Sequence, residues 1–302
     1  MITLNMGNII RSKKDGPKQL RLLLEKEEII LAPGAYDVLS AKMIEATGFK
    51  MVYMSGFGTA ASKLGYPDVG LVTMSEMVDT ASKIAEAVNI PVVGDGDTGY
   101  GNPINVIRTV QSYENAGIAG IQIEDQVFPK KCGHISGKQV VSIDEMVAKI
   151  RAACDARRSK DFVIIARTDA IAVEGIDSAI ARAKAYSKAG ADLIFVEAPE
   201  NLSQVEKIAK ELQGIPLVYN WAEGGKSPQL DIEVLRKLGF KIVIFPVSTL
   251  FAAAKAIKEV LESIKQNGTP LKVMNKLISF QEFLNFIGLS EVYELEKKYI
   301  YN

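Results

Sequence analysis

The sequence predicts an α/β protein in which eight parallel strands close into a (β/α)8 TIM-type barrel. Eight short apolar runs rich in Val and Ile recur along the chain, and continuous runs of about five such residues are typical of strands buried on both faces. Segments with helical period separate the runs, and several of these end in Gly, as helices often do. Eight strand–helix units in about 250 residues match the length of this barrel.

The eight runs are of two alternating kinds, one that follows a Gly-punctuated junction and one that does not. An open doubly wound sheet is the alternative, but no G-x-G-x-x-G follows the first run, where Ala32-Pro33-Gly34-Ala35 stands instead. In chain order the runs are IILAPGAYD, ATGFKMVYMSG, IPVVGDGD, NAGIAGIQIED, DFVIIARTD, KAGADLIFVEAP, IPLVYNW and KLGFKIVIFP.

The intervening segments carry helix-start signals. The helix predicted over Thr73–Val88 begins with a Thr cap and has apolar residues three and four apart. Pro103 stands in the first turn of the next helix, and Ser142 is the predicted cap of the one after. The remaining helical segments are NPINVIRTVQSYENAG, SIDEMVAKIRAACDARR, GIDSAIARAKAYSKAG, NLSQVEKIAKEL and LFAAAKAIKEVLESIKQNG.

Beyond the eighth unit, residues 270–302 predict one or two extra amphipathic helices. Their apolar residues, which include Phe280, Phe283, Phe286 and Leu289, need a surface to cover, and either this barrel or a neighbouring subunit could supply it. No linker rich in Pro, Gly or Ser divides the chain, so we predict a single domain over residues 1–302.

Composition excludes several classes of protein. The 36 basic and 36 acidic residues cancel, so no global basic field exists to hold nucleic acid or an anionic membrane. The longest uncharged stretch, residues 242–254, is shorter than the roughly 20 residues of a membrane span. Residues 1–16 have no apolar core of signal-peptide length, and two cysteines cannot build a disulfide framework. We therefore expect a soluble, cytoplasmic protein with free thiols.

Polar residues end the predicted strands, where barrel enzymes carry their chemistry. Acids converging there would repel one another unless a cation relieves them. Only one histidine, His134, is present, so the expected cation is a hard ion held by carboxylates, Mg2+ or else Mn2+. Taken singly, each acid could equally be a helix cap or an ion-pair partner. The strand-end residues are Tyr53, Ser55, Gly56, Asp95, Asp97, Glu124, Asp125, Arg167, Asp169, Glu197 and Asn220.

The long polar loop over residues 128–138 is predicted to act as a lid over the site. Cys132 lies there among Lys130, Lys131 and His134. We therefore expect the pKa of its thiol to lie below that of a free thiol, which is about 8.5. We also expect this thiol to act as an acid–base or nucleophilic group. We expect His134 to donate to a substrate carboxylate. Arg167 suits bidentate carboxylate recognition, with a structural ion pair to the acids as its alternative.

Three segments together carry a resemblance to a known family. KKCGH with a following Gly-Lys, GDGDTGYGN, and AG-x-x-G-x-x-IEDQ resemble the isocitrate lyase/phosphoenolpyruvate mutase superfamily from about Ala32 to the end of the chain. The resemblance implies an α/β barrel, a helix beyond the eighth strand that is exchanged between subunits, and a homotetramer.

The resemblance also implies roles for individual residues. Asp95 matches the direct Mg2+ ligand, and Asp97 and Glu124 match acids that hold metal-bound waters. Cys132 matches the acid–base residue of the lyase branch, so we predict Cys132, Glu124 and Arg167 as catalytic. Asp68 matches a further acid near the metal, although by sequence alone it is a turn residue after Pro67. The implied substrate contacts are Tyr53, Ser55, Gly56, Asp68, Gly133, His134, Arg167, Glu197 and Asn220.

The implied activity is Mg2+-dependent cleavage of a 2-hydroxydicarboxylate of the 2,3-dimethylmalate or 2-methylisocitrate type to pyruvate and a second carboxylate. Residues 135–138 depart from the Arg-Pro-Asn-Lys typical of methylisocitrate lyases, and residues 223–228 look more like dimethylmalate lyase, its plant relatives and carboxyphosphonoenolpyruvate phosphonomutases. Phosphonomutase chemistry and oxaloacetate decarboxylation on the same metal site are therefore alternatives. A non-catalytic binding protein and a Schiff-base aldolase are weaker ones, since the acids and Cys132 are present and no Lys ends a strand.

Overall fold

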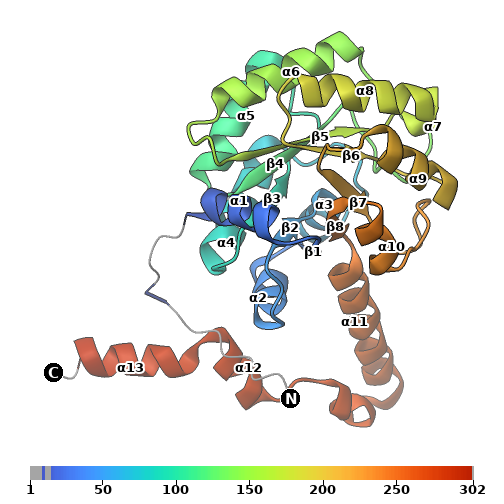
Figure 1. The fold of residues 1–302 in the computed structure, drawn as a ribbon. Helices are drawn as coiled ribbons and strands as arrows, with labels where there is room; N and C mark the ends of the chain where they lie inside the picture. Colours follow the sequence, from blue (N-terminus) through green and yellow to red (C-terminus); the bar gives the residue numbers. More distant parts are fainter. Residues whose placement is uncertain (1–8, 11–14, 301–302) are drawn as a thin grey trace.

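Eight parallel strands form a closed barrel in chain order in the computed structural model, which describes residues 9–10 and 15–300 (Figure 1). Each strand pairs with the next, and β1 closes the barrel against β8. The predicted barrel is confirmed, and all eight apolar runs are strands. They are β1 (Ile30–Ala35), β2 (Val52–Met54), β3 (Val92–Asp95), β4 (Gly120–Glu124), β5 (Val163–Thr168), β6 (Leu193–Val196), β7 (Leu217–Asn220) and β8 (Phe240–Phe245).

The apolar side chains of the strands divide between two cores. One lies between the sheet and the surrounding helices. The other fills the inside of the barrel, where Met51, Phe195 and Ile242 pack with Leu20 of α1 (Gly16–Lys26). Both faces of the strands are therefore buried, which is why the strands read as continuous rather than alternating apolar runs.

The predicted helix starts are confirmed. Thr73 and Glu76 form a reciprocal capping box at α4 (Met74–Ala87), Asn102 caps α5 (Pro103–Asn115) with Pro at its first position, and Ser142 caps α6 (Ile143–Ala156). The short helices were not predicted, since their apolar stripes are brief. The other helices of the barrel are α2 (Val38–Ala46), α3 (Gly56–Leu64), α7 (Ile171–Glu174), α8 (Ile176–Lys188), α9 (Leu202–Glu211) and α10 (Ile232–Lys237).

The C-terminal helices leave the barrel. α11 (Ser248–Asn267) leads away from it, and η1 (Leu271–Lys276), α12 (Phe280–Ile287) and α13 (Leu289–Tyr299) continue into an arm that stands apart from the strands (Figure 1). The arm exposes large apolar side chains, among them Leu271 at 75% and Phe280 at 79%. The extra helices are confirmed, and their apolar residues are unevenly covered, since Phe286 is buried whereas Leu271 and Phe280 are exposed. Across residues 9–10 and 15–300, no helix has the length and apolar character to cross a membrane.

Candidate active site

One cavity of about 220 Å³ opens at the carboxyl ends of the strands. Most of the predicted site residues line it, and they come from the four strands β2, β3, β5 and β7 and from the segments that follow β2, α3, β4 and β6. Asp97 and Glu124 lie buried behind this lining. The predicted residues in the lining are Tyr53, Ser55, Asp68, Asp95, Cys132, Gly133, His134, Arg167, Glu197 and Asn220.

Tyr53, Ser55 and Gly56 stand at the junction of β2 and α3. The Tyr53 hydroxyl donates to Gln122 Oε1 at 3.1 Å, and Ser55 Oγ caps α3 by accepting from the Gly58 N–H at 3.1 Å. A Cβ added to Gly56 would lie 2.5 Å from Asp95 Oδ2, so only Gly leaves this carboxylate oxygen accessible. The first turn of α3 thus begins beside Asp95 and next to the cavity-lining Ser55 and Phe57, and the N-terminus of a helix suits an anion.

Asp95 ends β3, and the chain turns sharply after it. Asp97 has a left-handed φ of 47°, so Asp95 and Asp97 do not lie on one side of a continuous strand. The turn lets the Asp97 N–H donate to Asp95 Oδ1 at 3.1 Å, and the Glu124 N–H donates to the Asp97 carbonyl at 2.8 Å. The three acids are therefore linked through the backbone.

Lys130 supplies the cation nearest these acids. Its Nζ lies 2.7 Å from Asp68 Oδ1 and 2.8 Å from Asp97 Oδ1, and its side chain is 3% exposed. Burial disfavours the charged form of Lys130, but Asp97 and Asp68 outweigh it and hold the Lys130 pKa well above its ordinary value. Burial raises the pKa of Asp97 to about 6 against the pull of Lys130. Asp68 is thus a partner of this lysine and not merely a turn residue.

The acids also suit a divalent cation. The described residues contain no ready-made group of three or more His, Cys, Asp or Glu ligands. However, Glu124 Oε1 is buried without a hydrogen-bond partner, and Asp95 Oδ2 is kept accessible by Gly56. Both donors are carboxylate oxygens, which Mg2+ and Mn2+ prefer. The residues therefore fit a hard cation that several water molecules would help to bind.

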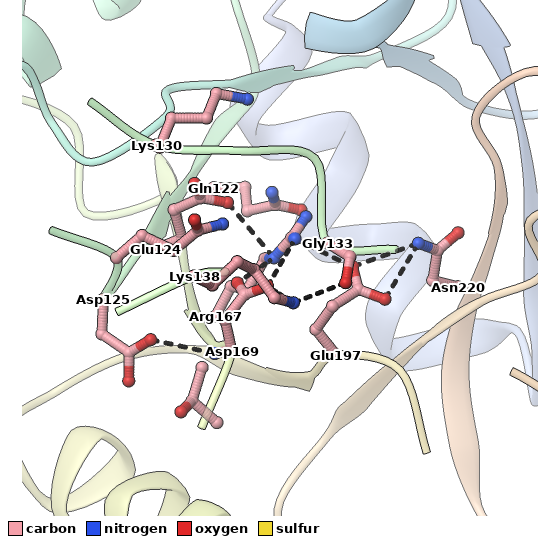
Figure 2. A network of polar contacts seen from close by, with 12 residues as sticks. Gln122, Glu124, Asp125, Lys130, Gly133, Lys138, Arg167, Asp169, Glu197 and Asn220 are labelled. Atoms are coloured by element: carbon pink, nitrogen blue, oxygen red, sulfur yellow. Dashed lines mark hydrogen bonds and ion pairs between the residues drawn. The ribbon is translucent and has the colours of Figure 1, made fainter. Parts of the chain in front are cut away.

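Arg167 lies at the centre of a second charge cluster (Figure 2). Its guanidinium donates to Asp169 at 2.8 and 3.1 Å, lies 3.0 Å from Glu197 and 3.3 Å from Glu124, and stacks 5.0 Å from the centre of the Phe195 ring. The structural ion pair that the sequence left open is therefore present. Burial opposes ionisation of Asp169, but Arg167 and Lys138 lower its pKa to about 2.

Lys138 joins the loop over residues 128–138 to this cluster. Its buried Nζ contacts Asp169 Oδ1 at 2.7 Å and donates to the Gly133 carbonyl (Figure 2). A Cβ on Gly133 would overlap Arg167 and Glu197, so the loop lies directly against the strand ends. Lys138 thereby fixes the segment that carries Cys132.

The thiol of Cys132 differs from its prediction. Lys130 points to the acids and Lys131 Nζ donates to the Gly137 carbonyl, so neither lysine pairs with the thiol. Burial, only partly offset by the His134 backbone N–H, raises the pKa of Cys132 to about 11. The expectation of an acidic thiol is wrong, and the group is neutral at pH 7. Cys154 is half-buried, with Sγ donating to the Gly190 carbonyl at 3.2 Å.

Polar groups lie close to both ring nitrogens of His134. Nδ1 accepts from the Lys226 N–H at 3.0 Å, and Nε2 lies 3.3 Å from Asn220 Nδ2. Burial lowers the pKa of His134, so the imidazole is uncharged at pH 7. Asn220 Nδ2 also contacts both Glu197 oxygens, at 3.2 and 3.1 Å, which places these three predicted residues together.

Sequence reasoning missed three residues of the site and misplaced one. Gln122, Lys130 and Lys138 were not predicted, although Gln122 stands two residues before Glu124 and so shares its face of the strand. Asp125 points to the outer layer, where it accepts from the Tyr186 hydroxyl at 2.8 Å and from the Asp169 N–H at 2.9 Å. Asp125 therefore holds the backbone of Asp169 in place and does not line the cavity.

Comparison with known proteins identifies the family. Residues 20–265 match the family described as phosphoenolpyruvate phosphomutase. The chain belongs to the phosphoenolpyruvate phosphomutase family. The fold and the three sequence segments described above agree with this membership, which confirms the resemblance.

Two curated members of the phosphoenolpyruvate phosphomutase family are similar to this chain. A 2,3-dimethylmalate lyase from Eubacterium barkeri is 47% identical over 281 residues, which cover 93% of this chain and 97% of that protein. A 2-methylisocitrate lyase from Aeropyrum pernix is 47% identical over 269 residues, which cover 89% and 86%.

Solved structures span a wider range of activities within the family. Oxaloacetate acetylhydrolase in complex with 3,3-difluorooxalacetate has a TM-score of 0.89 and 40% identity, covering 94% of this chain and 97% of that one. Phosphonopyruvate hydrolase in complex with oxalate and Mg2+ has a TM-score of 0.87 and 34% identity, covering 95% and 100%. The family therefore includes lyases, hydrolases and mutases on one fold.

Proposed function

We propose that this protein is a Mg2+-dependent carbon–carbon lyase that cleaves a 2-hydroxydicarboxylate to pyruvate and a second carboxylate. The observation that carries the proposal is that a neutral, half-buried thiol, that of Cys132, lines the same cavity as Asp95. A proton donor and an oxygen-rich cation site are the two components that such a cleavage needs. The lyase relatives support the same reaction class.

Asp95, Asp97 and Glu124 would hold the cation. When bound, Mg2+ supplies Lewis-acid stabilisation of negative charge on substrate oxygens. The Ser55 hydroxyl and the first N–H groups of α3, at Gly56, would bind the carboxylate of the pyruvate half, as helix N-termini do. Tyr53 stays protonated, because burial raises its pKa well above the ordinary value, so it can donate but not act as a base.

Cys132 would move the proton. In the cleavage direction the 2-hydroxyl of the substrate would lose its proton to a carboxylate of the acid cluster formed by Asp95, Asp97 and Glu124, and C2 would become the carbonyl carbon of pyruvate. The bond between C2 and C3 breaks, its electron pair stays on C3, and the thiol gives its proton to that carbon. In condensation the thiolate takes the proton back. A thiol whose pKa is about 11 is a neutral acid throughout the physiological range, as cleavage requires. Such proton transfer contributes about 10²–10⁴-fold to rate.

Arg167 and His134 would orient the rest of the substrate. Arg167 is held by Asp169 and Glu197, so its guanidinium is fixed before any ligand arrives. His134 and Asn220 present polar groups to the cavity beside Glu197. The loop over residues 128–138 would exclude water once it covers the substrate.

The test is Mg2+-dependent release of pyruvate, coupled to lactate dehydrogenase, from 2,3-dimethylmalate, 2-methylisocitrate and citramalate. EDTA should abolish turnover. Cys132→Ser should keep product binding and lose turnover by 10²-fold or more, whereas the matched control Cys154→Ser should retain it. Full turnover by Cys132→Ser would refute the role of the thiol.

Two other activities are tested by adding oxaloacetate and a phosphonate to that panel. An oxaloacetate-decarboxylating enzyme would release pyruvate from oxaloacetate and from no other member, and a structural relative named oxaloacetate acetylhydrolase supports oxaloacetate as a candidate. A phosphonomutase would act on phosphonates instead. A Schiff-base aldolase is disfavoured, because Lys130 is held charged by its acids and an imine-forming amine must lose its proton.

We also propose that the chain works as a single cytoplasmic domain and as a homotetramer whose C-terminal helices are exchanged between subunits. The exposed apolar side chains of the arm support this, since surfaces of that kind mark protein contacts. Light scattering behind a sizing column should give about four times 32.9 kDa. A monomer at micromolar concentration would refute it.

A further inference from the structure

The cavity is lined by two unlike sets of side chains. One set is polar and charged and comprises Asp68, Asp95, Lys130, Arg167, Glu197 and Asn220. The other set, which we call the apolar wall, comprises Phe57, Ile135, Ala222, Pro246, Val247 and Phe251. A substrate whose reacting oxygens contact the charged set leaves another part of itself to contact the apolar wall.

Much of the apolar wall comes from α3, from the turn after β8 and from the start of α11. Phe57 of α3 and Phe251 of α11 meet edge to face, with ring centres 6.2 Å apart and planes at 83°. Pro246 follows β8 and packs so closely on β1 that a Cβ at Gly34 would overlap it. Thr249 Oγ1 donates to the Gly34 carbonyl and ties the start of α11 to the same strand. This part of the wall is therefore packed against the barrel, whereas Ile135 belongs to the loop over residues 128–138.

The cations of the cavity already have partners. Among the described residues that line the cavity, the Lys and Arg residues are Lys130 and Arg167. Lys130 pairs with Asp68 and Asp97, and Arg167 pairs with three carboxylates. Neither is free to neutralise a carboxylate brought to the apolar side.

Glu223 adds a negative charge beside the wall. It lines the cavity next to Ala222, and the Ser248 hydroxyl donates to its Oε1. Its Oε2 is buried and has no hydrogen-bond partner among the described residues. A carboxylate on the substrate beside the wall would lie near the Glu223 carboxylate, and two like charges that are partly shielded from water repel each other.

We propose that the apolar wall is the site for the substituent on C3 of the substrate, that it takes an uncharged alkyl group, and that Glu223 selects against a third carboxylate. The inference rests on the proposed lyase function and narrows its substrate class to C3-alkyl 2-hydroxydicarboxylates. In these terms 2,3-dimethylmalate is preferred to the tricarboxylate 2-methylisocitrate.

The experiment compares substrates of equal size that differ in charge. 2-Methylisocitrate carries a carboxymethyl group on C3, and 3-isobutyl-2-methylmalate carries an isobutyl group of the same shape. We expect the alkyl compound to have the higher kcat/KM, on the order of tenfold for one like-charge contact. Glu223→Gln, which keeps shape and removes charge, should bring the two values together by raising that of the tricarboxylate. The matched control Glu233→Gln, on the outer surface of α10, should leave their ratio unchanged.

A binding measurement keeps this inference separate from the lyase assignment. Isobutylsuccinate carries the isobutyl group and tricarballylate the carboxymethyl group, and neither compound has a bond that the lyase would cleave. Calorimetry in the presence of Mg2+ gives their Kd values. Tighter binding of isobutylsuccinate, with the difference lost in Glu223→Gln, would support the wall even if no substrate released pyruvate. Preference for the tricarboxylate, or a ratio that Glu223→Gln does not alter, would overturn the proposal while leaving the lyase function standing.

Discussion

Lys138 should contribute to stability well beyond what its place in a polar loop suggests. Its side chain is 1% exposed and bridges Asp169 to the Gly133 carbonyl. Lys138→Met keeps the length of the side chain but leaves a buried carboxylate with one cation fewer. Removing one partner of a buried ion pair costs about 3–5 kcal/mol, and Asp169 keeps Arg167, so we expect the lower end, about 3 kcal/mol.

The expected change in Tm follows from the size of the chain. Unfolding entropy of about 2.1 cal/mol/K per residue gives roughly 0.6 kcal/mol/K for 302 residues, so about 3 kcal/mol lowers Tm by about 5 °C. Differential scanning calorimetry measures this directly. Lys131→Met is the matched control, since Lys131 also donates to a loop carbonyl but through a solvent-exposed hydrogen bond, and it should shift Tm by less than about 1 °C.

The pH dependence provides a second check on Lys138. The pKa of Asp169 is lowered to about 2 in the folded protein. The contribution of the ionised Asp169 carboxylate to the free energy of unfolding is therefore complete above about pH 3.9, the ordinary pKa of Asp, and is lost as pH falls toward 2. The difference in free energy of unfolding between Lys138→Met and the wild type should therefore become smaller as pH falls over that interval. A difference that is absent at pH 7, or that grows on acidification, would refute the reasoning.

Two further predictions concern the thiol and the acids. In a Cys154→Ser background, iodoacetamide should alkylate Cys132 at pH 8 about a hundredfold more slowly in the native protein than in urea, because its pKa rises from 9.0 to about 11 and thiolate is the reactive form; equal rates would contradict the raised pKa. Gly56→Ala should weaken Mg2+ binding measured by calorimetry, because the new Cβ would lie 2.5 Å from Asp95 Oδ2. Gly16→Ala, whose Cβ would make only ordinary contacts, is the control and should not change the affinity.

The barrel could be predicted because its signals are local. A strand buried on both faces must be apolar throughout, and each of the eight runs meets that condition. The caps at Thr73, Asn102 and Ser142 depend on a side chain three residues or fewer from its partner. By contrast, α3 has the sequence GFGTAASKL, whose small residues give little helical pattern.

The partners of the site charges could not be predicted, because they depend on how a loop folds back. Lys130 and Lys131 are neighbours in sequence, yet one is buried against Asp68 and the other lies at the surface. Local composition therefore suggested a cationic setting for Cys132, whereas burial dominates its pKa. The roles of Asp95, Asp97 and Glu124 came from the family resemblance, and their assignment to a metal stays a prediction.

The loop after β4 brings charge as well as a thiol to the barrel, and this bears on how such enzymes can be recombined. Lys130 and Lys138 compensate Asp68, Asp97 and Asp169 from within that one segment. A chimera that transplants the loop with Cys132 but omits either lysine would leave acids of the recipient uncompensated. A graft between relatives would then succeed only when residues 130–138 move together with the acid at position 68. Loop and rim behave as one exchangeable unit, larger than the catalytic group alone.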